Sequence, residues 1–75
     1  MERLEREERA ESADWHEQAS NAHFAAARRH HAAALRWDGV GDAVRAEFER
    51  RSARLERGAA ELEGDRAQFY RGRNT

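Results

Sequence analysis

The fold of this chain is decided by one short glycine-containing stretch near its middle, Trp37-Asp38-Gly39-Val40-Gly41-Asp42. The chain of 75 residues contains no proline, and no residue between Glu2 and Trp37 is a helix breaker. Gly39 is the natural C-terminal cap of a first helix, and Asp42 is the natural N-cap of a second. Because a short connection between two long helices makes them neighbours, the sequence predicts an all-α, antiparallel two-helix hairpin.

The expected organisation is a single hairpin with a charged beginning and a short end. Its segments are a charged N-terminal helical extension over 1–13, a first helix over 14–37, a turn over 38–42, a second helix over 43–71 and a tail over 72–75. Asp14 and Glu17 have the spacing of a helix-capping pair. Two starts of the first helix therefore stay open: one near Trp15 with a frayed extension, and one near the N-terminus.

A seven-residue repeat runs through both halves, which is typical of helices that pack along a seam, as in a coiled coil. Small residues recur in the first half and large ones in the second. When the halves are aligned about the turn, residues at the same height have numbers that add up to about 81. The predicted hairpin seam therefore sets small residues against large ones, with the two tryptophans at its ends; it comprises Trp15, Ala19, Ala26, Ala33, Trp37, Val44, Phe48, Leu55, Leu62 and Phe69.

A second apolar face lies on the first helix. Phe24 and Leu35 are eleven residues apart and share one side of a helix, together with Ala27 and His31. A lone hairpin would leave this face in water. We therefore expect it to be an interaction face, and we expect the hairpin to form a homodimer with the architecture of a four-helix bundle.

Three of the four histidines, His16, His23 and His30, repeat at the same seven-residue spacing. Rings seven residues apart on a helix are separated by about 10 Å along its axis, so one metal ion cannot bind two of them. The main interpretation is structural: they border the seam and hydrogen-bond to facing glutamates, of which the second helix offers Glu56, Glu61 and Glu63. A metal site would need ligands from the second helix or a second copy. If the histidines border a dimer interface, assembly would depend on pH.

Composition narrows the function. The net charge is −1, cysteine is absent, and no apolar run is long enough to span a membrane. No serine lies beside a base in a recognisable catalytic motif, and no glycine loop could cradle phosphate. We therefore expect a cytoplasmic, non-enzymatic protein without cofactor or metal. A nucleic-acid role stays as an alternative, carried by basic residues that the hairpin brings to the turn end: Arg28, Arg29, His30, His31, Arg36, Arg50, Arg51, Arg54 and Arg57.

The turn also suggests a family. The turn contains a tryptophan, any residue and a glycine, here Trp37, Asp38 and Gly39. This motif in the turn of a helical hairpin resembles that of the WXG family of small helical-hairpin proteins. The resemblance implies a dimeric four-helix bundle and export by a specialised secretion system. The export signal of that family is a tyrosine followed four residues later by an acid, and Tyr70 is followed at that distance by Asn74.

Taken together, the sequence predicts a small helical interaction or adaptor protein that acts through self-association and protein contacts. The alternatives are a WXG-like secretion substrate or effector, and a small nucleic-acid-binding or regulatory protein.

Overall fold

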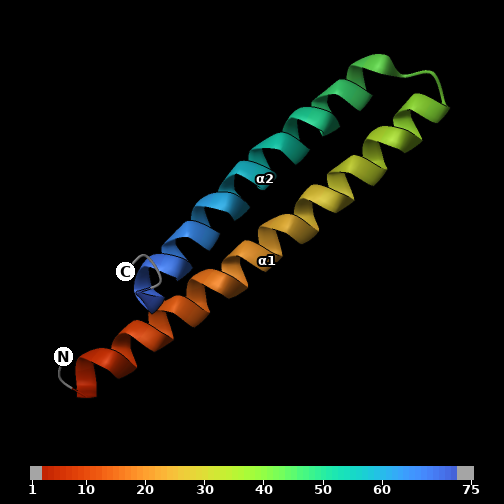
Figure 1. Cartoon of the computed structure of the whole chain (residues 1–75). Helices are drawn as coiled ribbons and strands as arrows, with labels where there is room; N and C mark the ends of the chain where they lie inside the picture. Colours follow the sequence, from red (N-terminus) through yellow and green to blue (C-terminus); the bar gives the residue numbers. More distant parts are fainter. Residues whose placement is uncertain (1–2, 73–75) are drawn as a thin grey trace.

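Two long helices lie side by side in opposite directions in the computed structural model, which describes residues 3–72 (Figure 1). Helix α1 spans Arg3–Gly39 and helix α2 spans Ala43–Arg71. The chain doubles back once, and the first turns of α1 extend beyond the end of α2 (Figure 1). The described part is 58 Å long and 18 Å by 12 Å across. The predicted all-α antiparallel hairpin is confirmed.

Helix α1 is continuous from Arg3, so the described part of the charged extension, residues 3–13, belongs to it and no second start occurs near Trp15. The i, i+4 pair of Arg3 and Glu7, whose Nε and Oε1 atoms are 3.1 Å apart, is of the kind that supports an exposed helix start. Residues 1–2 and 73–75, which include most of the predicted tail, lie outside the described residues.

The connection confirms one predicted cap and corrects the other. The Asp42 carboxylate accepts a hydrogen bond of 2.9 Å from the Arg45 backbone N–H, as an N-cap does. Gly39, however, is still helical, and the left-handed residue is Gly41, with φ of 81°. The Trp37 carbonyl oxygen accepts from the backbone N–H of residues 40 and 42, which closes the turn after the end of α1.

The two helices meet along a seam of small side chains. Its buried members on α1 are Ala13, Ser20, Ala27 and Ala34, and on α2 they are Ala46, Ala53, Ala60 and Ala67. The Ser20 hydroxyl donates a hydrogen bond of 2.8 Å to the Ala60 carbonyl oxygen, which fixes the register. Residues at the same height have numbers that add up to about 80, close to the predicted alignment. Small residues allow the two backbones to approach closely.

The predicted side-chain content of the seam is wrong. On α1 the buried column lies one residue beyond the predicted one, a rotation of about 100°, so Ala19, Ala26 and Ala33 are only half-buried. On α2 the predicted column points outward, and its four members, Phe48, Leu55, Leu62 and Phe69, are exposed. Trp15 and Val44 are exposed as well. Trp37 is half-buried at the turn.

The physical reason is polar. The observed rotation places the histidine column of α1 directly opposite a glutamate column of α2. The hairpin therefore gains three hydrogen bonds across its interface and leaves its large apolar side chains outside.

Candidate interaction surfaces

Three histidine–glutamate pairs cross the hairpin at successive levels between the alanines; we call them the His–Glu ladder. The Nδ1 atom of the imidazole lies 2.6 Å from Oε2 of the carboxylate in the pair of His16 and Glu63. The corresponding distances are 2.7 Å for His23 with Glu56 and 3.0 Å for His30 with Glu49. The expectation that the column consists of structural histidines bonded to facing glutamates is confirmed.

The rung nearest the open end is the most enclosed. Glu63 is buried, with 7% of its surface exposed, and it also contacts the guanidinium of Arg66. The His16 ring stacks on Tyr70, with ring centroids 5.4 Å apart, and meets Trp15 edge-on at 5.0 Å. The hydrogen bond from His16, helped by that from Arg66, lowers the pKa of the Glu63 carboxyl, although desolvation acts in the opposite direction. Because an ionised carboxylate only accepts, the proton of the hydrogen bond sits on Nδ1 of His16.

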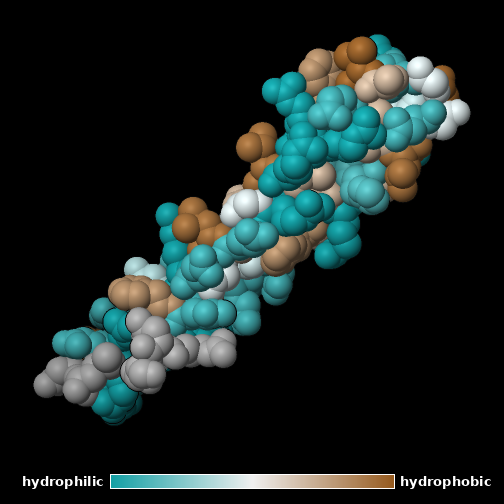
Figure 2. All heavy atoms as spheres, turned by 45° about the horizontal axis from the view of Figure 1, so that its top comes forward, coloured by the Kyte–Doolittle hydropathy of each residue, from teal (hydrophilic) through white to brown (hydrophobic). Residues whose placement is uncertain are grey.

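The largest apolar side chains lie on the outside of the hairpin. Phe48, Leu55, Leu62 and Phe69 repeat every seven residues along α2, and Leu55 exposes 76% of its surface. We call these four residues the outer column. No large apolar side chain is buried anywhere in residues 3–72. Figure 2 shows hydrophobic groups emerging at intervals along the length of the molecule, separated by hydrophilic surface.

The outer column borders one particular side of the hairpin, which we call the alanine side. It is formed by half-buried small residues that each directly precede a buried seam residue. Antiparallel helices are related by an approximate two-fold axis normal to their common plane, so equivalent positions on the two helices lie on the same side. On α2, Leu55 lies three residues after Ser52 and four residues before Ala59, so it is next to both on the helix surface. The half-buried residues of the alanine side are Ser12, Ala19, Ala26, Ala33, Ser52 and Ala59.

The opposite side, which we call the arginine side, is bridged by ion pairs. The Arg71 guanidinium lies 3.1 Å from carboxylate oxygens of both Asp14 and Glu17. Nearer the turn, Arg50 lies 2.9 Å from an oxygen of Asp38. The arginine side therefore carries guanidinium–carboxylate pairs between α1 and α2, whereas the alanine side is bridged by the His–Glu ladder, each of whose histidines lies three residues before an alanine of that side.

The predicted interaction face on α1 holds only in part. Phe24, Leu35 and His31 are exposed, as expected for an outer face. Ala27 is buried in the seam, with 4% of its surface exposed, so its inclusion was wrong. A shallow groove on the arginine side is lined by Phe24 and His31 from α1 and by Arg57 from α2. Whether Phe24 and Leu35 bind a partner remains a prediction.

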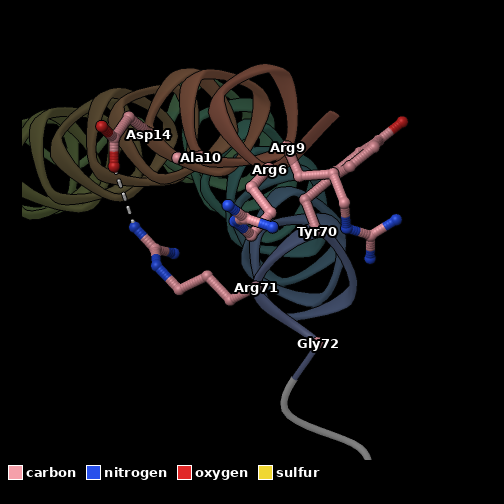
Figure 3. A pocket seen from close by; sticks show the side chains of 7 residues that line it. All are labelled: Arg6, Arg9, Ala10, Asp14, Tyr70, Arg71 and Gly72. Atoms are coloured by element: carbon pink, nitrogen blue, oxygen red, sulfur yellow. Dashed lines mark hydrogen bonds and ion pairs between the residues drawn. The ribbon is translucent and has the colours of Figure 1, made fainter. Parts of the chain in front are cut away.

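A pocket lies at the open end, between the start of α1 and the end of α2 (Figure 3). Arginine side chains surround it, with Tyr70 at its edge, which is the kind of lining that an anion prefers. Arg71, however, pairs with Asp14, as the dashed line in Figure 3 marks, and Arg9 donates to the Phe69 carbonyl oxygen at 2.9 Å. These cations are already engaged, so the pocket is a weak candidate for binding.

The basic group at the turn end is also partly neutralised. Arg50 and Arg54 both contact the carboxylate of Glu47, at 3.1 and 3.2 Å. These contacts lower the pKa of Glu47 and keep it negative. His30 is held by Glu49 in the ladder. The predicted basic surface therefore carries interleaved acids, which weakens the case for phosphate binding.

Residues 3–72 also lack the arrangement needed for a metal site or for a membrane-spanning helix. No three histidine or acidic side chains of this part converge as ligands for a metal ion. Neither α1 nor α2, over the same residues, has an apolar stretch of the length needed to cross a bilayer.

Sequence reasoning missed Glu49 and the buried columns that flank the ladder. The signal was present: Glu49, Glu56 and Glu63 repeat at the same seven-residue spacing as the histidines. Two such columns with the same spacing match rung by rung along a pair of packed helices.

Comparison with known protein families, with curated proteins and with solved structures found no match for this chain.

Proposed function

We propose that this protein is a non-enzymatic helical interaction protein that acts through self-association and contacts with other proteins. The observation that carries the proposal is the outer column of α2, whose large side chains are exposed at a regular spacing. Isolated exposed apolar residues are ordinary, but an aligned series marks an interaction surface. A repeat of seven residues is also the spacing that a second packed helix requires.

The composition of the seam supports the same proposal. Alanine methyl groups remove little apolar area from water, so the contact of α1 with α2 contributes modestly to stability. Chains below about 80 residues commonly need a disulfide, a metal or a partner as well. Because the chain contains no cysteine, association through its exposed surface is the remaining source of stability that this surface offers.

The His–Glu ladder fits a structural role better than a catalytic one. A histidine paired with a carboxylate resembles two members of a hydrolytic triad, which would need a nucleophile on the other ring nitrogen. Ser20, between two rungs, directs its hydroxyl to the Ala60 carbonyl oxygen instead. The ladder thus aligns the two helices and presents the outer column on a rigid support.

The experiment is thermal unfolding followed by circular dichroism over a range of about 1 to 100 µM protein, with the solution mass measured by sedimentation. A hairpin that is stabilised by association unfolds at a higher temperature when its concentration rises. Leu62→Ser should lower the midpoint and remove its concentration dependence, whereas Ala32→Ser, on an exposed outer position of α1, should leave that dependence in place. A monomeric mass and a constant midpoint over the whole range would refute self-association.

A further inference from the structure

We infer that the alanine side is covered by a second copy of this chain, related by a two-fold axis parallel to the long axis of the hairpin. In the resulting four-helix bundle, α2 of each copy packs against α1 of the other. This inference rests on the proposed self-association and specifies its face, symmetry and register.

The register within the hairpin fixes which residues would meet. The bonds of His23 with Glu56 and of Ser20 with Ala60 show that residues at equal height have numbers adding up to 79 or 80. A rotation about an axis parallel to the helices leaves every residue at its own height. The partner's Leu55 therefore arrives at the height of residues 24–25 of α1, within about 3 Å of the level of Ala26.

The match repeats along the bundle. By the same register, the partner's Leu62 reaches the level of Ala19 and the partner's Phe48 reaches that of Ala33. Large residues of one copy thus meet the small, half-buried residues of the other at three successive levels. These are the pairs that the heptad columns of the sequence suggest, and the two-fold axis moves them from one chain to the boundary between two chains.

The large side chains of α1 lie at heights between the levels of the partner's outer column. Trp15 is exposed and belongs to the same side, because it lies four residues before Ala19. Its height falls between those of Leu62 and Phe69 of the outer column, so the rings would interdigitate with the partner's side chains rather than collide. Arg29 falls between the levels of Phe48 and Leu55, where an aromatic face can receive a guanidinium.

The direction of the axis follows from the same columns. An axis running across the helices in the contact plane would place α2 on α2 and set one outer column against the other, where the alanine side offers only Ser52 and Ala59 as small residues, compared with three alanines on α1. Either axis gives each helix two antiparallel neighbours, as in an up-down bundle, and so opposes the helix dipoles; the small residues therefore decide between the two axes.

The exposed apolar area on the alanine side is sufficient for a dimer interface. Trp15 and the four residues of the outer column each expose between 50% and 76% of their surface. At roughly 200 Å² for a large side chain, they offer on the order of 500–600 Å² per copy. The half-buried alanines add to this, which brings the contact near the ~800 Å² per partner of a standard interface. Of the exposed large apolar side chains, the arginine side offers Phe24 and Leu35 alone.

The test is disulfide trapping, which suits a chain that contains no cysteine. In the double variant Ala26→Cys/Leu55→Cys, oxidation should join two copies by two symmetric disulfides and give a covalent dimer on non-reducing gels. Each single variant should stay uncrosslinked, because identical helices lie on the diagonal of the bundle. The matched control Phe24→Cys/Leu55→Cys changes one position by two residues, to the arginine side, and should also remain uncrosslinked.

Dissociation constants from sedimentation separate the remaining possibilities. Leu55→Ser removes one exposed leucine from each of two symmetric contacts and should weaken the dimer about 30-fold or more, whereas Phe24→Ser should change it less than about 3-fold. A dimer that crosslinks through Phe24, or one that Phe24→Ser weakens more, overturns this geometry and leaves self-association standing. An intrachain disulfide in the first double variant overturns both the geometry and the seam. A monomeric wild-type chain overturns the proposed self-association itself.

Discussion

Replacing Ala60 with leucine tests the seam where it is tightest. Ala60 has no exposed surface, and its carbonyl oxygen accepts the 2.8 Å hydrogen bond from Ser20. A leucine side chain adds three carbon atoms at a contact that holds only a methyl group, so α1 and α2 must move apart. Overpacking of this kind costs about 1–3 kcal/mol. Weakening the buried hydrogen bond of Ser20 adds about 1 kcal/mol.

The expected loss is therefore about 2–4 kcal/mol in the free energy of unfolding. For a domain of this size it corresponds to a fall of roughly 10–25 °C in the thermal midpoint. The assay is the far-ultraviolet circular dichroism melt, compared at equal concentration with Ala32→Leu, an exposed position of α1 where the change should stay within about 0.5 kcal/mol. Equal midpoints for the two variants, or a more stable Ala60→Leu protein, would refute the assignment of the seam.

Two further predictions concern charge and backbone. The hydrogen bond from His16 holds the pKa of Glu63 below the ordinary 4.5, so this carboxylate contributes stability above pH 4.5 that is lost as the pH falls through the lowered pKa. When the melting temperature is measured at decreasing pH, Glu63→Gln should therefore show a shallower decline below pH 4.5 than the unmodified chain. An unchanged slope would count against the ladder. Gly58→Ala should raise stability by about 1 kcal/mol in urea denaturation, because a Cβ there meets open space on a helix, whereas Gly41→Ala should lower it, because its φ is 81°. A loss at position 58 would show that its open surroundings are wrong.

The elements of the fold were readable from the sequence because their signals are local. The turn follows from its two glycines, Gly39 and Gly41, and from the cap at Asp42, and the helices follow from the absence of breakers on either side. Local chemistry also located the histidine column, since its spacing excluded a metal site on one helix and pointed to carboxylates on the other. Two of its three partners, Glu56 and Glu63, lay among the residues expected to face it.

The faces of the helices were not readable in the same way. A seven-residue repeat of large side chains shows that they pack against a helix, but it does not show whose helix. The repeat predicts Leu55 and Leu62 in the contact within the chain, where burial is expected for a monomer. The hairpin instead closes on Ala53 and Ala60, because that rotation also satisfies the His–Glu ladder. Only the energies of the two competing rotations, which depend on the pairing of polar groups, decide between them.

The most direct test of the account is a nuclear Overhauser measurement of methyl contacts in a sample that mixes isotope-labelled and unlabelled chains. The account predicts contacts between the Ala27 and Ala53 methyl groups within one chain, and contacts of Leu55 with Ala26 between labelled and unlabelled chains. Contacts of Leu55 with Ala26 inside a single chain, without contacts between Ala27 and Ala53, would contradict it.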